Sequence, residues 1–233
     1  MKLTERQAAN IQEYLAGHKL CHGIGTYELA CSIAAINLAI SGELTDDIPD
    51  CMSLVIGKWI IRVQDSMPLE MINSNEWKLL LPLAAGTGRS KEAERKEIII
   101  EWMWQQLKQI QGIADNNGFG KEWKLMCNKK TYRAADAAAY AAATADAAYA
   151  AAADDAAASD AAAYAAAYAD DADAAYADAD ADADAAAAAA ADAAYAAAYA
   201  AYADAADDDA KSAFWEKADP IGLLNRLINI EVY

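Results

Sequence analysis

The feature that most constrains this chain is a segment of 77 residues, 134–210, built almost entirely from three residue types. It contains 50 Ala, 17 Asp and 8 Tyr, and one Thr and one Ser complete it. The chain has neither Gly nor Pro from Lys121 to Asp219. Because Gly and Pro mark turns and alanine has the best helix propensity, the composition predicts helix over this region.

The aspartates predict where these helices end. Asp is unfavourable inside a helix and favourable at an N-cap, where its carboxylate accepts hydrogen bonds from free backbone amides. The Asp clusters lie at 154–155, 170–173, 178–184 and 207–209. They predict corners between helices of roughly 134–153, 156–169 and 185–206. Alanine lets helices approach closely and tyrosine supplies larger contacts, so we expect an array of closely packed helices.

The remainder of the chain predicts an all-α fold. Residues 1–120 are expected to form a bundle of about five helices, residues 121–219 the acidic array, and residues 220–233 an amphipathic cap. That cap could cover the array or pack on the bundle. The bundle helices are predicted near 5–16, 27–40, 50–65, 75–85 and 91–111, and no run alternates as a strand does. Their expected core anchors are Trp59, Trp77, Trp102 and Trp104.

Local signals set these predicted helix ends. Thr4 and Gln7 form a capping box, and Thr26 can cap the second helix, which Gly42 ends. Pro68 is expected to end the third helix. Gly86 is expected to end the fourth, and the turn-rich "DNNGFG" the fifth.

Charge is segregated along the chain. Residues 1–130 hold 15 Lys/Arg and 16 Asp/Glu, a net charge of −1, whereas residues 131–233 hold 4 and 20, a net charge of −16. Such a polyanion repels nucleic acid and anionic membranes and favours basic protein surfaces. The start of the chain resembles no signal peptide, and no long uncharged apolar run is present apart from alanine. We therefore expect a soluble, cytoplasmic protein.

Signals for catalysis or metal binding are weak. The two histidines, His18 and His22, lie in one predicted loop, and "GIG" and "GTG" lack the remainder of a phosphate-binding motif. Cys21, Cys31, Cys51 and Cys127 form no paired C-x-x-C pattern, so reduced thiols are expected. "DADADAD" lacks the glycine turn and closing Glu of a calcium loop. The sequence therefore favours a non-enzymatic protein without cofactor or metal, and a small enzyme using Cys21 or His22 is an alternative.

The spacing of the carboxylates allows a comparison with nucleic acid. Duplex DNA carries one charge per about 1.7 Å of axis. Seventeen Asp along one helix about 115 Å long give one charge per about 7 Å, whereas three parallel helices about 40 Å long give one per about 2.3 Å. Mimicry of nucleic acid is thus expected only for a compact array. The alternative is that Asp merely keeps an alanine surface soluble. The predicted partner-binding residues are Asp170, Asp171, Asp173, Asp178, Asp180, Asp182, Asp184, Tyr168 and Tyr176.

Two stretches resemble known groups of proteins. "DCMSLVIGKWIIRVQDSMPLEMINSNEWKLLLPLAAGTGR" resembles bacteriophage and prophage proteins of unassigned activity. The alanine-rich tail ending in "SAFWEKADPIGLLNRLI" resembles the Ala-rich helical domain of predicted bacterial immunity proteins. These resemblances imply a phage or prophage setting, in the cytoplasm of a bacterial host and in conflict between host and mobile element. Together with the charge, they lead to the hypothesis of a non-enzymatic counter-defence inhibitor that occupies a basic, nucleic-acid-binding surface of a host protein. The alternatives are a structural spacer or homo-oligomerisation protein and a toxin-immunity-like binder.

Overall fold

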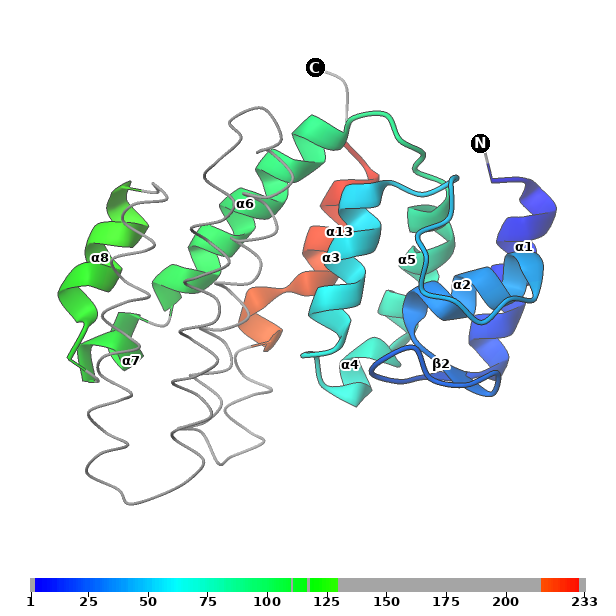
Figure 1. The fold of residues 1–233 in the computed structure, drawn as a ribbon, viewed down its shortest axis with the longest axis horizontal. Helices are drawn as coiled ribbons and strands as arrows, with labels where there is room; N and C mark the ends of the chain where they lie inside the picture. The colour runs from blue at the N-terminus through cyan, green and yellow to red at the C-terminus, as the bar shows by residue number, and fades with distance from the viewer. Residues whose placement is uncertain (1–2, 110, 117, 130–214, 231–233) are drawn as a thin grey trace. The chain divides into compact units, whose positions relative to one another are not determined.

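The computed structural model describes residues 3–109, 111–116, 118–129 and 215–230, which are mostly helical, as predicted (Figure 1). One compact unit contains the described residues up to Ile99 together with those from 215 onward, and residues 100–129 belong to a second unit. The first unit contains α1 (Glu5–Gly17), β1 (Lys19–Leu20), β2 (Leu29–Ala30), α2 (Ser32–Ser41), α3 (Leu54–Gln64), α4 (Leu69–Ile72), α5 (Asn75–Ala85) and α13 (Pro220–Ile228).

Helix α1 begins with the predicted capping box. The Thr4 hydroxyl oxygen accepts the backbone N–H of Gln7 at 3.3 Å, and the Gln7 side-chain oxygen accepts that of Thr4 at 3.0 Å. Ile11 and Leu15 are buried on the face that packs against α2 and α5. This helix was therefore predictable from local sequence.

The second helix begins later than predicted, and a short parallel sheet precedes it. Thr26 caps no helix, because its hydroxyl oxygen accepts the backbone N–H groups of Glu28 and Leu29 within a turn. Strand β2 then pairs with β1, with Lys19 opposite Leu29. Cys31 is the real N-cap of α2, where its sulfur accepts the Ala34 N–H at 3.3 Å. The prediction of an all-α fold without strands is corrected to a mostly helical fold with this two-stranded sheet.

The third helix also begins later than predicted, at Leu54. Residues just before it form a turn, in which the Met52 N–H donates to the Pro49 carbonyl at 2.9 Å. Ser53 then caps α3 through its hydroxyl. The helix ends at Gln64, and Pro68 directly precedes the short helix α4, which the sequence pattern did not predict.

Helix α5 is the centre of the first unit, because it contacts α1, α2, α4 and α13. Its Trp77 is fully buried, and the indole N–H donates to the Ser32 hydroxyl on α2 at 3.0 Å. Trp59 of α3 is also buried, with its ring centroid 6.1 Å from that of Trp77. These two tryptophans are core anchors as predicted, whereas Trp102 and Trp104 are only half-buried.

The predicted fifth helix corresponds to α6 (Glu92–Gln109). Two shorter helices follow, α7 (Gln111–Asn116) and α8 (Gly120–Lys129), and α7 packs against α8. Gly118 has a φ of +85° between the last two, in agreement with the predicted turn. Phe119 and Trp123 pack edge to face, with ring centroids 5.8 Å apart.

Helix α13 returns to the first unit, where it packs against α5 and α3 (Figure 1). Pro220 is at its first turn, where a missing N–H costs nothing, and Asp219 caps it by accepting the Gly222 N–H at 2.9 Å. Leu223, Leu224 and Leu227 are buried. The amphipathic chain end therefore packs on the bundle.

Candidate functional site

The nine predicted partner-binding residues all lie outside the described residues, so their role stays a prediction. They are Tyr168, Asp170, Asp171, Asp173, Tyr176, Asp178, Asp180, Asp182 and Asp184. The structure does show how the two chain segments on either side of them are held. Residues up to Ile99 and residues from 215 onward fold into the same unit. In the sequence, the nine residues therefore lie between two parts of one unit, within residues 100–206.

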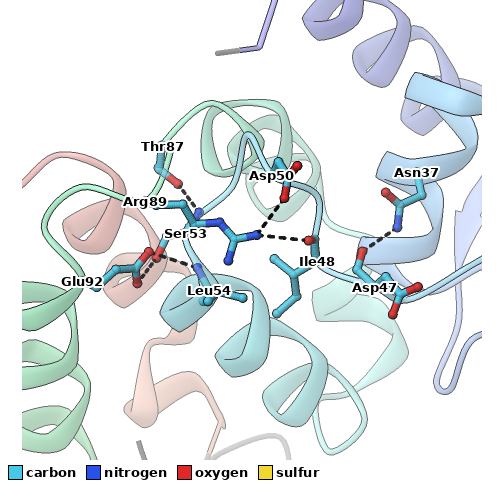
Figure 2. Close-up of polar contacts among 9 residues, drawn as sticks. All are labelled: Asn37, Asp47, Ile48, Asp50, Ser53, Leu54, Thr87, Arg89 and Glu92. Atoms are coloured by element: carbon cyan, nitrogen blue, oxygen red, sulfur yellow. Dashed lines mark hydrogen bonds and ion pairs between the residues drawn. The ribbon is translucent and has the colours of Figure 1, made fainter. Parts of the chain in front are cut away.

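Glu92, at the start of α6, holds the N-terminus of α3 (Figure 2). Its carboxylate accepts the backbone N–H groups of Leu54 and Val55, each at 3.1 Å. It also accepts the Ser53 hydroxyl at 2.8 Å. Free amides and the helix dipole both favour negative charge at this position. The anion that this helix end favours is thus supplied by the chain itself.

The "GTG" loop before α6 closes against the residues that precede α3. The Thr87 hydroxyl oxygen accepts the Ser53 N–H at 3.0 Å, and the Gly88 N–H donates to the Cys51 carbonyl at 2.8 Å. Arg89 forms an ion pair with Asp50 (Figure 2), in which a guanidinium nitrogen lies 3.5 Å from a carboxylate oxygen. Within the loop, the N–H groups of Gly86 and Thr87 donate to the carbonyls of Leu83 and Ala84 at 3.1 and 3.2 Å, so all three backbone amides of the motif have partners in the chain.

Arg95 holds the C-terminal end of α13 from the next turn of α6. The guanidinium, which is buried, donates to the Leu227 carbonyl at 3.1 Å and also to the carbonyls of Gly88 and Ser90. Burial lowers the pKa of Arg95, and the nearby Glu92 and Glu94 counteract that shift. A cation at a helix C-terminus is favourable for the helix dipole.

We call Glu92, Arg95 and the backbone groups they bind the α6 clasp. The clasp joins the helix that leads toward the acidic segment to the helix that follows it in the sequence. Both of its charged groups are occupied by partners within the chain, so its chemistry is anchoring. It was not predicted, because its partners are distant in sequence.

The residues considered for catalysis have structural partners. The Cys21 thiol donates to the Leu29 carbonyl at 3.2 Å, and His22 Nε2 lies 2.9 Å from the Met67 carbonyl oxygen. Burial raises the pKa of Cys21, and the negative charge of Asp65 raises it further, which disfavours the reactive thiolate. His18 stacks on the Tyr14 ring at 4.0 Å, and its Nδ1 lies 2.8 Å from the Tyr14 carbonyl oxygen. This geometry favours a role in holding the loop.

The four cysteines are free thiols, and three of them, Cys31, Cys51 and Cys127, are buried. Within the described ranges, no three His, Cys, Asp or Glu side chains gather as metal ligands would. None of the helices in these ranges is long and apolar enough to cross a membrane.

A feature that the sequence reasoning missed is an open groove between α5 and α13. It has a volume of about 420 Å³, and Leu79, Leu80 and Ile221 line it together with Glu76 and Asp219. The run "WKLLLPLAA" is apolar around most of the helix, although α5 needs only one apolar face for the core. These additional leucines were the sequence feature that could have predicted an exposed apolar surface on α5.

Comparison with protein-family models, with curated proteins and with solved structures found no match to this chain.

Proposed function

We propose that this protein is a non-enzymatic binder whose acidic segment occupies a basic, nucleic-acid-binding surface of a partner protein. The observation that carries the proposal is the charge of residues 134–210, where 17 Asp occur without a single Lys or Arg. A basic groove that binds a polyanion does so largely through charge neutralisation. A counter-defence inhibitor acting on a host protein fits this chemistry and the resemblance to phage proteins.

The folded unit supports this proposal because its two parts, residues up to Ile99 and residues from 215 onward, lie on either side of the acidic segment in the sequence. α6 and α13 are joined by the α6 clasp, in which Arg95 binds the Leu227 carbonyl. A segment tethered at both ends has less conformational freedom to lose on binding than a free tail. The nearly neutral folded unit thus supports the acidic segment.

The experiment compares two full-length variants that differ only in charge. In the first, the seven aspartates from Asp170 to Asp184 become Asn, and in the second the same seven become Glu. Each is used to capture proteins from a bacterial lysate, and the captured basic protein is then tested for displacement of a labelled DNA duplex. We expect the Asn variant to bind at least tenfold more weakly and the Glu variant to bind within about threefold of the parent.

Salt provides the second measurement for the same proposal. Binding to the captured partner is expected to weaken strongly between 0.05 and 0.5 M salt, because exposed charges are screened. Binding that is indifferent to salt and to the Asn substitutions would contradict the proposal. Light scattering tests the spacer or oligomerisation alternative. That alternative is favoured if the mass of the parent rises with concentration, the mass of the Asn variant does not, and both proteins bind the captured partner equally.

A further inference from the structure

We propose that the groove between α5 and α13 is a docking site for an amphipathic, basic helix of a partner protein. Leu79 and Leu83 lie one turn apart on α5 and are 63% and 54% exposed. Two large apolar side chains at this spacing are the pattern that a helix presents to another helix. Leu79 lines the groove, and Leu83 extends the same face toward the end of α5.

The groove combines an apolar floor with an acidic edge. Leu79 and Leu80 from α5 and Ile221 from α13 provide apolar surface, and Glu76, Asp219 and Asn225 provide polar groups. Both ionisable residues of this lining are therefore carboxylates. A helix with Leu or Ile on one face and Lys or Arg beside it complements both features.

Charge also separates a basic partner from a second copy of this chain. The whole chain has a formal net charge of −17, so two copies repel each other as they approach. Pairing two such grooves would also bring carboxylates of the same kind together. The groove therefore favours a partner of opposite charge over self-association.

The walls of the groove are fixed from behind, so it exists before a partner binds. Trp77 and Leu81 on the inner side of α5 are fully buried, and the Trp77 indole is bound to Ser32. On the other wall, Leu224 is fully buried and Arg95 binds the Leu227 carbonyl. A preformed site needs little ordering when it binds, which favours affinity.

The inference rests on the proposed function in one respect, since both assign a basic partner. The groove supplies leucine and isoleucine side chains, which a segment of Ala, Asp and Tyr does not contain, so it gives selectivity among basic proteins. The probe for the test is a labelled synthetic 18-residue helix of Leu and Lys, with a matched peptide that carries Glu in place of Lys. Binding to the full chain is measured in 0.5 M salt, which suppresses attraction to the acidic segment.

Two double variants isolate the groove. The first is Leu79→Ser with Leu83→Ser, and its control is Leu54→Ser with Leu69→Ser, two leucines that are 41% and 48% exposed on other helices. We expect the groove variant to bind the Leu/Lys peptide at least tenfold more weakly and the control to bind within twofold of the parent. In 0.1 M salt, where Glu76 and Asp219 are less screened, the loss caused by the groove substitutions is expected to be larger for the Lys peptide than for the Glu peptide.

The fold and the binding position are checked independently. Circular dichroism should show the same helix content in the parent and in both double variants, because all four leucines are exposed. In methyl NMR spectra, the Lys peptide should shift the signals of Leu79 and Leu83 and leave that of Leu69 in place. Shifts confined to Leu69, or a groove variant that binds as the parent does, would overturn the inference.

The charge variant separates the two proposals. Replacement of the seven aspartates from Asp170 to Asp184 by Asn should leave peptide binding in 0.5 M salt unchanged while it weakens capture of the basic partner. If that variant loses the peptide and the groove variant keeps it, the groove inference fails and the proposed function stands. Self-association that the groove variant abolishes would identify a second copy as the occupant and would also overturn the inference.

Discussion

Glu92 and Arg95 lie one helical turn apart at the start of α6 and bind the opposite ends of two other helices. The Glu92 carboxylate accepts backbone N–H groups at the N-terminus of α3, and the Arg95 guanidinium donates to the Leu227 carbonyl near the C-terminus of α13. Each charge has the sign that the adjacent helix dipole favours. One turn of helix thus connects three segments that are far apart in sequence.

Glu92→Gln is expected to lower the free energy of unfolding by about 1–2 kcal/mol. The amide keeps one oxygen acceptor, but it loses the negative charge and replaces the second acceptor with a donor. The measurement is urea unfolding followed by circular dichroism. Glu97→Gln is the control, because Glu97 is exposed on the same helix, and it should change stability by less than about 0.5 kcal/mol. Equal effects of the two substitutions would contradict the role of the carboxylate as a cap.

Arg95→Ala is expected to cost about 3 kcal/mol, because the buried Leu227 carbonyl and two partly buried carbonyls lose their charged donor. Arg95→Lys should recover part of that loss, since an ammonium cannot reach all three carbonyls as a planar guanidinium does. Hydrogen exchange should show faster exchange of the α13 amides in both variants, because α13 loses its attachment to α6. Arg226→Ala, at an exposed position on α13, is the control and should leave exchange unchanged. If exchange instead becomes faster by the same factor throughout the chain, the effect of the clasp is not local to α13.

Local chemistry explains which parts of the fold could be predicted. Features that depend only on neighbouring residues could be predicted from the sequence. Examples are the capping box of Thr4 and Gln7 and the end of α2 at Gly42. Thr26 misled the prediction because a hydroxyl that accepts amides two and three residues ahead is common to a helix cap and to a turn. Only the pairing of β2 with the distant β1 distinguishes the two cases.

The contacts that position the candidate surfaces are non-local. Glu92 binds residues 37 to 39 positions earlier, and Arg95 binds a carbonyl 132 positions later. No local pattern identifies such partners. The groove could be predicted only in part. The additional leucines of α5 are evident in the sequence, but the packing of α13 beside them is not. The predicted acidic contact residues lie outside the described part of the chain, so the sequence alone supports them.

Gly25→Ala is expected to destabilise the fold by about 2–4 kcal/mol, from a strained φ and an overlap with its neighbours. Gly25 has a φ of +78°, and an added Cβ would lie 2.0 Å from the Leu29 carbonyl oxygen and 2.6 Å from the Cys21 sulfur. Gly23→Ala is the matched control, since its φ is +63° but nothing lies within 4 Å of its Cβ position. The control should cost only about 1–2 kcal/mol in thermal or urea unfolding. Equal losses would show that crowding in this loop is unimportant.

Stability is expected to fall as pH rises above about 9. Burial raises the pKa of the Cys31, Cys51 and Cys127 thiols above their ordinary value of 9.0. The unfolded chain then releases these protons at a lower pH than the folded protein does. The stabilisation is therefore complete below the unfolded pKa and is lost as pH rises through the folded values. Lys78, whose pKa burial lowers, acts in the opposite direction, so a variant is needed to isolate the thiols.

Cys31→Ser provides that isolation. The serine hydroxyl can still accept the Ala34 N–H at the start of α2, but it does not titrate in this range. Urea unfolding at pH 7, 8, 9 and 10 in reductant should therefore show a shallower alkaline loss in this variant than in the parent. The difference in unfolding free energy between the two proteins should be constant below pH 8 and should shift in favour of the variant above pH 9. Parallel curves over the whole range would exclude Cys31 as a source of the pH dependence.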